Sequence, residues 1–259
     1  MKNKPITLEE RKMIQLEMLK EIDSFCRSNN IRYSLAFGTL LGAIRHKGFI
    51  PWDDDVDIMM PLPDMLKFKE KFHSEVLKYC DVDTETDYEF SFSRIANTNT
   101  INKIGIIVET YGICIDVYPL ISVPSEHDKR EEFFNNANKI GKRRKSLVKW
   151  RSRIITRFPI RNIPGFHKSV KKYRDFMFNT EPYGSTGMYY IIAGPLRLRN
   201  KMTYDFDMFD NIIEVEFEGY KFLATAHYDK YMKLRYGDYM QLPPENQRHP
   251  YHGGNYYWK

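Results

Sequence analysis

Residues 38–58 read GTLLGAIRHKGFIPWDDDVDI, and the acidic end of this stretch is the most informative part of the chain. Asp53, Asp55 and Asp57 occupy alternate positions, so on a β-strand their side chains share one face at steps of about 6.5 Å. The apolar residues beside them then point the opposite way, into a core. Carboxylates held on one face repel one another unless a cation lies among them. Oxygen-only ligands suit Mg²⁺ or Mn²⁺, ions that commonly hold phosphate groups, so the stretch predicts a divalent-metal site for phosphate chemistry.

A run of aspartates can also be a solvated loop or the start of a calcium-binding EF-hand loop. This run is bordered by the apolar segments 49–52 and 58–60, which disfavours a polar linker. The EF-hand loop needs glycine at its sixth position, where this chain has Ile58. Pro61 and Pro63 would also interrupt the backbone that supplies its ligands. The sequence therefore favours a strand that borders the core.

Composition and length indicate a globular protein with a substantial core, and its cysteine content indicates a reducing compartment. The chain has 259 residues, of which 42% are hydrophobic and 15% aromatic, enough for a substantial core. Its three cysteines, Cys26, Cys80 and Cys114, form no CxxC pair, which argues against a disulfide framework. The first residues lack the apolar stretch of a secretory signal, and no run of 18 apolar residues occurs. We expect a cytoplasmic protein.

The net charge of +6 is distributed very unevenly. Residues 139–174 contain fourteen lysines and arginines and no acidic residue, which leaves −8 for the rest of the chain. Aromatic and aliphatic residues are interleaved with these cations. Such a segment can lie on an anionic membrane surface, bind a phosphate-rich soluble ligand or form a solvated helical face. We favour peripheral contact with the anionic inner face of a membrane through residues 139–174.

Local patterns predict an alternation of helices and strands. Thr7 and Glu10 have the spacing of a helical capping box, and apolar residues follow it at helical intervals. The other expected elements are a strand over 31–37, a break at 38–39, a short helix over 40–44, a helix capped by Asp64, strands near 90–96 and 104–108, a hairpin over 212–224 that turns at 218–219, and a helix over 228–236 that ends at Gly237.

A further strand is predicted over residues 111–119. Ile113, Ile115 and Val117 would share one face, and Asp116 would lie on the other. A lone aspartate in an apolar strand is costly to bury without a partner. Structural hydrogen bonds or a metal shared with Asp55 and Asp57 would each satisfy it.

These elements together predict an α/β (α+β mixed) fold, in which a mixed β-sheet is flanked by helices. We expect a single domain over residues 1–259, with a basic helical insertion at about 126–175.

The motifs resemble the LicD family of phosphotransferases, which includes the fukutin-related proteins of animals. The resemblance is carried mainly by 38–46 and 49–58, and also by 94–100 (RIANTNT), 112–119 (GICIDVYP) and 235–239 (RYGDY). It runs from about residue 20 to 245, and the basic insertion is its poorest match. Membership implies a nucleotidyltransferase-like core and a phospho-alcohol moved from a CDP-linked donor to a glycan hydroxyl. In bacteria the transferred group is often phosphocholine, and related members move ribitol phosphate or glycerol phosphate.

The resemblance also implies roles for individual residues. Gly38 and Thr39 match a turn that approaches the donor phosphates. Asp55 and Asp57 match metal-binding acids, with Asp53 just upstream, and Asp116 matches a third carboxylate on a neighbouring strand. Arg45 and Arg94 are candidate phosphate ligands. One or two Mg²⁺ ions on these acids would neutralise the donor diphosphate, and one of the acids, with Asp116 our first choice, would accept the hydroxyl proton.

Other activities remain open. Nucleotidyl transfer with release of pyrophosphate could use the same acids. A nucleic-acid-binding module built on the basic segment is disfavoured, because no aromatic RNA-binding motif or zinc-finger spacing accompanies it. The leading hypothesis is therefore phosphocholine transfer to a cell-surface glycan or its lipid-linked precursor.

Overall fold

The computed structural model describes residues 4–104, 107–109, 112–154, 163–193, 196–249 and 255–259. A mixed sheet runs through the centre of the molecule in the order β1 (Ser34–Leu35), β2 (Asp57–Pro61), β7 (Cys114–Ser122), β4 (Ser93–Asn97) and β3 (Leu77–Cys80). β8 (Tyr189–Ile191) also pairs with β7, and β9 (Thr203–Tyr204) pairs with β8. β2 and β7 are parallel and the other pairs are antiparallel. The predicted class, a mixed sheet flanked by helices, is confirmed.

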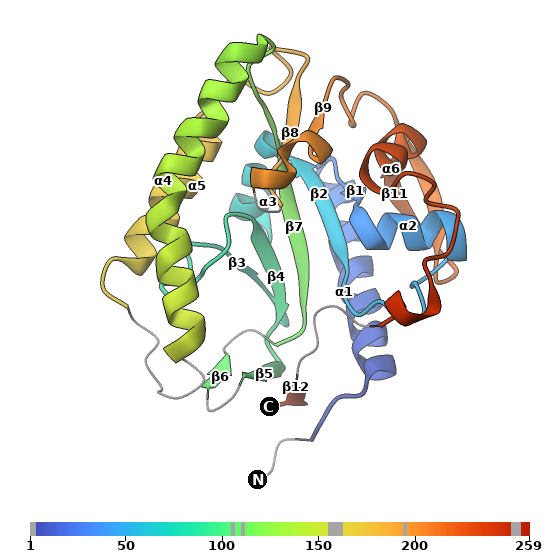
Figure 1. The fold of residues 1–259 in the computed structure, drawn as a ribbon. Coiled ribbons are helices and arrows are strands. Elements are labelled where there is room, and N and C mark those ends of the chain that lie inside the picture. The colour runs from blue at the N-terminus through green and yellow to red at the C-terminus, as the bar shows by residue number, and fades with distance from the viewer. Residues whose placement is uncertain (1–3, 105–106, 110–111, 155–162, 194–195, 250–254) are drawn as a thin grey trace.

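Two smaller sheets complete the strands. β10 (Ile212–Phe217) and β11 (Tyr220–Thr225) form the predicted hairpin, with positive φ at Glu218 and Gly219. β12 (Asn255–Trp258) pairs with β5 (Thr100–Ile104), which also pairs with β6 (Ile107–Glu109). A bridge between Pro5 and Tyr257 brings both ends of the chain to the same side of the molecule (Figure 1).

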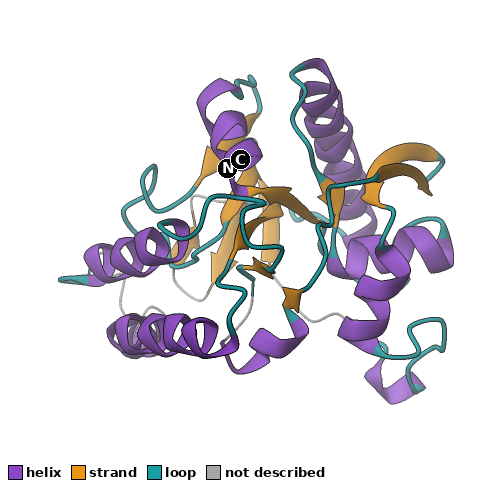
Figure 2. Ribbon diagram, turned by 90° about the horizontal axis from the view of Figure 1, so that it is seen from above, coloured by secondary structure: helices purple, strands orange, loops and turns teal. Residues whose placement is uncertain are grey.

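Helices surround the central sheet on several sides (Figures 1 and 2). α1 (Leu8–Ser28) and α3 (Leu62–Lys71) pack against β7, and α2 (Phe37–His46) packs against β2. α4 (His127–Ile154) and α5 (Phe166–Phe178) pair on one side of the molecule, whereas α2 and α6 (Tyr228–Tyr236) lie on the other. Short 3₁₀ turns occur at Leu196–Lys201 and Glu245–Gln247. No helix of the described ranges has the length and apolar character needed to cross a membrane.

Several local predictions are confirmed by contacts. The Thr7 hydroxyl accepts from the Glu10 N–H and the Glu10 carboxylate accepts from the Thr7 N–H, so the capping box is complete. α6 ends at Gly237, where φ is +74°. Ile113, Ile115 and Val117 are fully buried, as their common face requires.

Four other predictions need correction. The strand expected over 31–37 pairs only at Ser34–Leu35, because α2 begins at Phe37; Gly38 and Thr39 therefore lie inside a helix. The acidic strand begins only at Asp57, and residues 53–56 form a loop. The expected strand over 104–108 is divided between β5 and β6, and residues 105–106 lie outside the described ranges. Asp64 does not cap α3: it lies in the first turn and binds the backbone N–H and guanidinium of Arg32.

The described parts of the basic segment are mainly the helices α4 and α5, residues 155–162 lie outside the described ranges, and much of the charge on these helices is internal. Arg144 donates to the Glu89 carbonyl, and Arg151 pairs with the carboxylates of Glu89 (3.0 Å) and Asp87 (3.9 Å). Arg174 pairs with Asp83 at 2.8 Å, which lowers the pKa of that carboxyl. The acidic stretch 81–89 thus supplies the counter-charges that residues 139–174 lack. The cations on this inner side hold the helix pair to the rest of the fold.

Candidate active site

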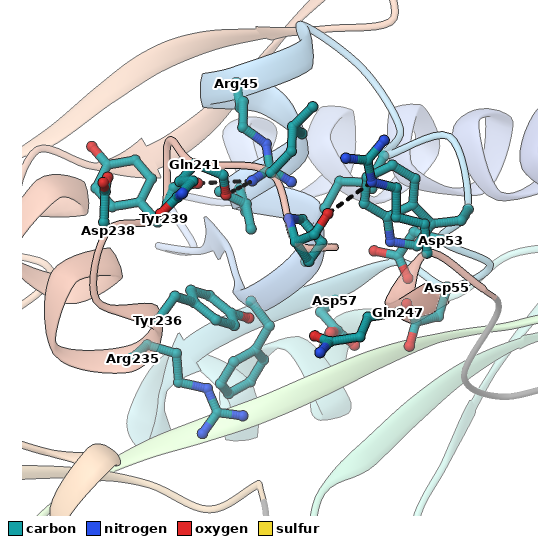
Figure 3. Close-up of a pocket in the computed structure, with 18 of the residues that line it drawn as sticks. Arg45, Asp53, Asp55, Asp57, Arg235, Tyr236, Asp238, Tyr239, Gln241 and Gln247 are labelled. Atoms are coloured by element: carbon teal, nitrogen blue, oxygen red, sulfur yellow. Dashed lines mark hydrogen bonds between the residues drawn. The ribbon is translucent and has the colours of Figure 1, made fainter. Parts of the chain in front are cut away.

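One pocket of about 1000 Å³ gathers most of the predicted site residues. It is lined by the first turn of α2, the loop before β2, the C-terminal end of α6 and the segment 238–248. Figure 3 shows Asp53, Asp55 and Asp57 at one end of this pocket and Arg235 with Tyr236 at the other. The pocket therefore joins residues from opposite ends of the sequence.

The first wall of the pocket is acidic. Asp53, Asp55 and Asp57 all line it, as their alternation predicts, although only Asp57 belongs to a strand. Asp54 does not line the pocket: it is 2% exposed and its carboxylate accepts from Arg11 at 3.1 Å. Ligand oxygens from Asp53, Asp54 and Asp55 can lie within 4.8 Å of one another. The Arg11–Asp54 ion pair holds the loop in place while its neighbours face the pocket.

Electrostatic repulsion within this acid wall is large. Burial, and then the neighbouring Asp55 charge, raise the pKa of Asp53 to about 7. Burial and the charges of Asp55, Asp116 and Asp53 raise the pKa of Asp57 well above its ordinary value. Asp57 Oδ1 is buried and has no hydrogen-bond partner among the described residues. A divalent cation with oxygen ligands fits this donor set, because it would offset the repulsion and satisfy the buried oxygen.

The N-terminus of α2 lies directly beside the acid wall. Phe37 has a φ of +44°, unusual for a residue with a side chain, and its N–H donates to the Tyr231 hydroxyl at 3.1 Å. A Cβ on Gly38 would lie 2.4 Å from Asp53 Oδ2, so only glycine allows this approach. The N–H groups of the first helical turn have no partner within the helix, which makes this end suited to a phosphate. Gly38 lines the pocket, as expected.

Thr39 has a different environment from the one expected. Its side chain is buried, and its hydroxyl accepts from the Asp57 N–H at 2.8 Å. Thr39 is not among the residues that line the pocket. The hydroxyl therefore fixes the start of β2, and with it the position of the Asp57 carboxylate. Contact between Thr39 and a donor phosphate stays a prediction.

Asp116 and Arg94 lie next to the site but bind each other. The parallel register places Asp116 beside Asp57. Arg94 Nε donates to Asp116 Oδ1 at 2.7 Å, and the Tyr118 hydroxyl donates to Asp116 Oδ2 at 3.2 Å. The Arg94 guanidinium also covers the Phe90 ring at 3.9 Å. Neither residue lines the pocket, so a metal-binding or proton-accepting Asp116 and a phosphate-binding Arg94 both stay predictions.

The pocket lining also includes three arginines, Arg45, Arg235 and Arg248. Arg45, the only one predicted, donates to the carbonyls of Tyr239 at 2.8 Å and Gln241 at 3.3 Å (Figure 3). Burial and the nearby Arg248 lower the pKa of Arg45. Arg248 donates to the Pro243 carbonyl at 2.8 Å.

Arg235 was missed by the sequence analysis. Its guanidinium lies 5.0 Å from the centre of the Phe37 ring and donates to the Met202 sulfur at 3.6 Å. Its Nε is buried without a hydrogen-bond partner in the described ranges. Across those same ranges, Arg45, Arg235 and Arg248 form no ion pair with a carboxylate within 4.0 Å. Three such guanidiniums in the lining of one pocket offer donors to an anion.

Comparisons with known proteins agree with this architecture. Residues 30–171 match the family model described as LicD/FKTN/FKRP, nucleotidyltransferase domain. The chain is 27% identical to the lipopolysaccharide cholinephosphotransferase LicD of Haemophilus influenzae, over 96% of this chain and 97% of that protein. A shorter match, 41% identical, relates 24% of the chain to 21% of an uncharacterized protein of Rickettsia typhi. Another, 50% identical, relates 16% of the chain to 16% of an uncharacterized protein of Rickettsia prowazekii. The chain belongs to the LicD family.

Proposed function

We propose that this protein transfers a phospho-alcohol, phosphocholine above all, from a CDP-linked donor to a hydroxyl of a cell-surface glycan or its lipid-linked precursor. The observation that carries the proposal is that three aspartates and three arginines line one pocket. A diphosphate donor needs both: carboxylates for a divalent cation and guanidiniums for the phosphate oxygens. The cholinephosphotransferase relative, aligned over nearly its whole length, supports choline as the alcohol.

The aromatic lining of the pocket gives further support to choline. Phe37, Trp52, Tyr118, Tyr236 and Tyr239 all contribute to it. The faces of aromatic rings attract quaternary ammonium groups. Arg235 lies over the Phe37 ring and Arg248 over the Trp52 ring, so two aromatic faces of this pocket already carry cations.

Different residues of the pocket would bind the metal, orient the diphosphate and accept the hydroxyl proton. Asp53, Asp55 and Asp57 would hold Mg²⁺ or Mn²⁺, which when bound neutralises charge on the donor phosphates. Arg45 and Arg235, together with the N-terminus of α2, would orient the diphosphate. The acceptor oxygen bonds to the β-phosphorus as the bond from that phosphorus to the CMP oxygen breaks, and the hydroxyl proton passes to a site carboxylate.

The decisive experiment measures CMP and pyrophosphate release from CDP-choline, CDP-ribitol and CDP-glycerol with a glycan acceptor, in Mg²⁺ or EDTA. CMP release from CDP-choline should require the metal. Asp57→Asn should reduce it by at least about 100-fold, since a buried site carboxylate is lost. Asp128→Asn, which removes a fully exposed carboxylate, should leave it unchanged.

Arg235 provides a second arm of the same experiment. Arg235→Met should reduce CMP release by about 10- to 100-fold and Arg235→Lys by less, because only the positive charge survives in the lysine variant. Release of pyrophosphate from a nucleotide donor would identify nucleotidyl transfer instead. CMP release from CDP-ribitol or CDP-glycerol alone would replace choline by that alcohol. Undiminished turnover in EDTA would refute the metal-dependent proposal.

A further inference from the structure

The outer face of α4 carries a basic stripe that is distinct from the inward cations. Within residues 139–153, exposed side chains recur at intervals of three and four residues, which places them on one side of the helix. We define the outer stripe by these residues: Lys139, Lys142, Arg143, Ser146, Lys149, Trp150 and Arg153. It holds five cations, one half-exposed tryptophan and no acidic side chain.

The opposite face of the same helix is packed against the protein. Phe134 and Ala137 belong to the main core, and Leu147 and Val148 pack against a second apolar cluster. Arg151, only 5% exposed, is neutralised by the acidic stretch 81–89. The structure thus separates the positive charge of α4 into an inner pair, Arg144 and Arg151, that binds the stretch 81–89, and an outer set whose side chains are exposed. Only the outer set can meet a large partner.

We propose that the outer stripe docks the protein on an anionic lipid surface. Clustered lysines and arginines are drawn to acidic headgroups, and their aliphatic stems can lie along the interface while the charges stay hydrated. Trp150 is 50% exposed near the C-terminal end of the stripe, and tryptophan prefers the boundary between headgroups and acyl chains. A solvated helical face has no need of an exposed tryptophan among its cations.

The position of the stripe is compatible with catalysis on a membrane-bound acceptor. α4 lies along one side of the molecule, while α2 and α6, which line the pocket, lie on the other (Figures 1 and 2). Docking through α4 therefore leaves the pocket open. The docking proposal does not depend on which phospho-alcohol is transferred.

The test is flotation of the full-length protein with phosphatidylcholine vesicles that contain or lack 30% phosphatidylglycerol. The stripe variant is Lys142→Glu/Lys149→Glu. The matched control is Lys71→Glu/Lys221→Glu, which makes the same change in net charge at exposed residues elsewhere. Each cation removed should weaken partitioning about fivefold, so the stripe variant should bind about 25-fold or more weakly. The control should bind like the wild type.

Two further readouts separate this proposal from the catalytic one. Vesicles should shift the tryptophan emission of the wild type to shorter wavelength, and Trp150→Phe should abolish that shift. CMP release in solution should be equal in the stripe variant and the control, which also shows that both fold. Equal loss of binding in the two charge variants, binding to neutral vesicles, or tight binding of RNA without binding of vesicles would overturn lipid docking.

Discussion

The acid wall should make the metal-free protein less stable as pH rises, and Asp53 is the residue at which this effect can be isolated. Burial and the neighbouring Asp55 raise its pKa from 3.8 to about 7. Because this value lies above that of an unfolded aspartate, the unfolded chain loses its proton first as pH rises. The stability contributed by the neutral carboxyl is therefore complete below about pH 4 and is lost progressively up to about pH 7.

The size of the effect follows from the two pKa values. A difference of about three pKa units corresponds to about 4 kcal/mol of unfolding free energy. At pH 5 the unfolded state is already mostly ionised, so about 2.5 kcal/mol of this loss falls between pH 5 and pH 8. Asp53→Asn keeps the shape of the neutral acid and cannot ionise, so it should abolish this part of the pH dependence.

The assay is urea unfolding followed by circular dichroism at pH 5 and pH 8 in EDTA. The stability of Asp53→Asn relative to the wild type should increase by about 2.5 kcal/mol from pH 5 to pH 8. Asp128→Asn, at a fully exposed carboxyl, should show no such increase. Mg²⁺ should stabilise the wild type at pH 8 more than it stabilises Asp53→Asn. A stability difference that is equal at both pH values would refute the reasoning.

Two further substitutions test the construction of the site and of the helix pair. Gly38→Ala places a Cβ 2.4 Å from Asp53 Oδ2, so the carboxylate must move. The Mg²⁺ affinity measured by calorimetry and the rate of CMP release should each fall by about tenfold or more. Unchanged Mg²⁺ affinity would contradict the close approach. Arg151→Met removes the ion pairs that Arg151 forms with Glu89 and Asp87, and urea unfolding should show a loss of about 2 kcal/mol. The nearby exposed Lys149→Met should cost less than about 0.5 kcal/mol, and equal losses would mean that the inner cation is not structural.

The parts of the fold that the sequence predicted best are those decided by neighbouring residues. The capping box at Thr7, the turn at Glu218–Gly219 and the end of α6 at Gly237 each depend on a few adjacent side chains or on one backbone conformation. The prediction was wrong where a distant partner decides. Asp64 has the residue type of a helix cap. Its carboxylate instead accepts hydrogen bonds from the backbone N–H and the guanidinium of Arg32, which lies 32 positions earlier in the sequence.

The candidate site shows the same division between local and distant information. Asp53, Asp55 and Asp57 were found from their alternation, which persists in a loop because Asp54 is held by Arg11. Arg235 was missed as a site residue although it begins the segment 235–239 that carries part of the family resemblance, because its own segment does not show that it shares a pocket with the acids. Only the tertiary structure shows that its guanidinium is near the pocket and without a carboxylate.

The prediction that the cations of residues 139–174 face a membrane was incomplete, again because distant residues are involved. Residues 139–174 have no acidic residue of their own, and their cations were all candidates for a membrane surface. The stretch 81–89 pairs with several of them, including Arg151 and Arg174. Those partners are contributed by a segment more than 60 positions away along the chain, so a local count of charge could not reveal them.

The hydrogen bond from the Phe37 N–H to the Tyr231 hydroxyl has a consequence for how the protein matures during synthesis. The two residues are 194 positions apart, so the first turn of α2 cannot acquire its final partner until Tyr231 has left the ribosome. Until then the emerging carboxylates have neither Arg235 and Arg248 nor a finished helix end beside them. Closing such a long loop is among the slower steps of folding. A fragment cut at residues 30–171, the limits of the family match, would lack Tyr231 and Arg235 and so would bind a diphosphate poorly even if its central strands formed.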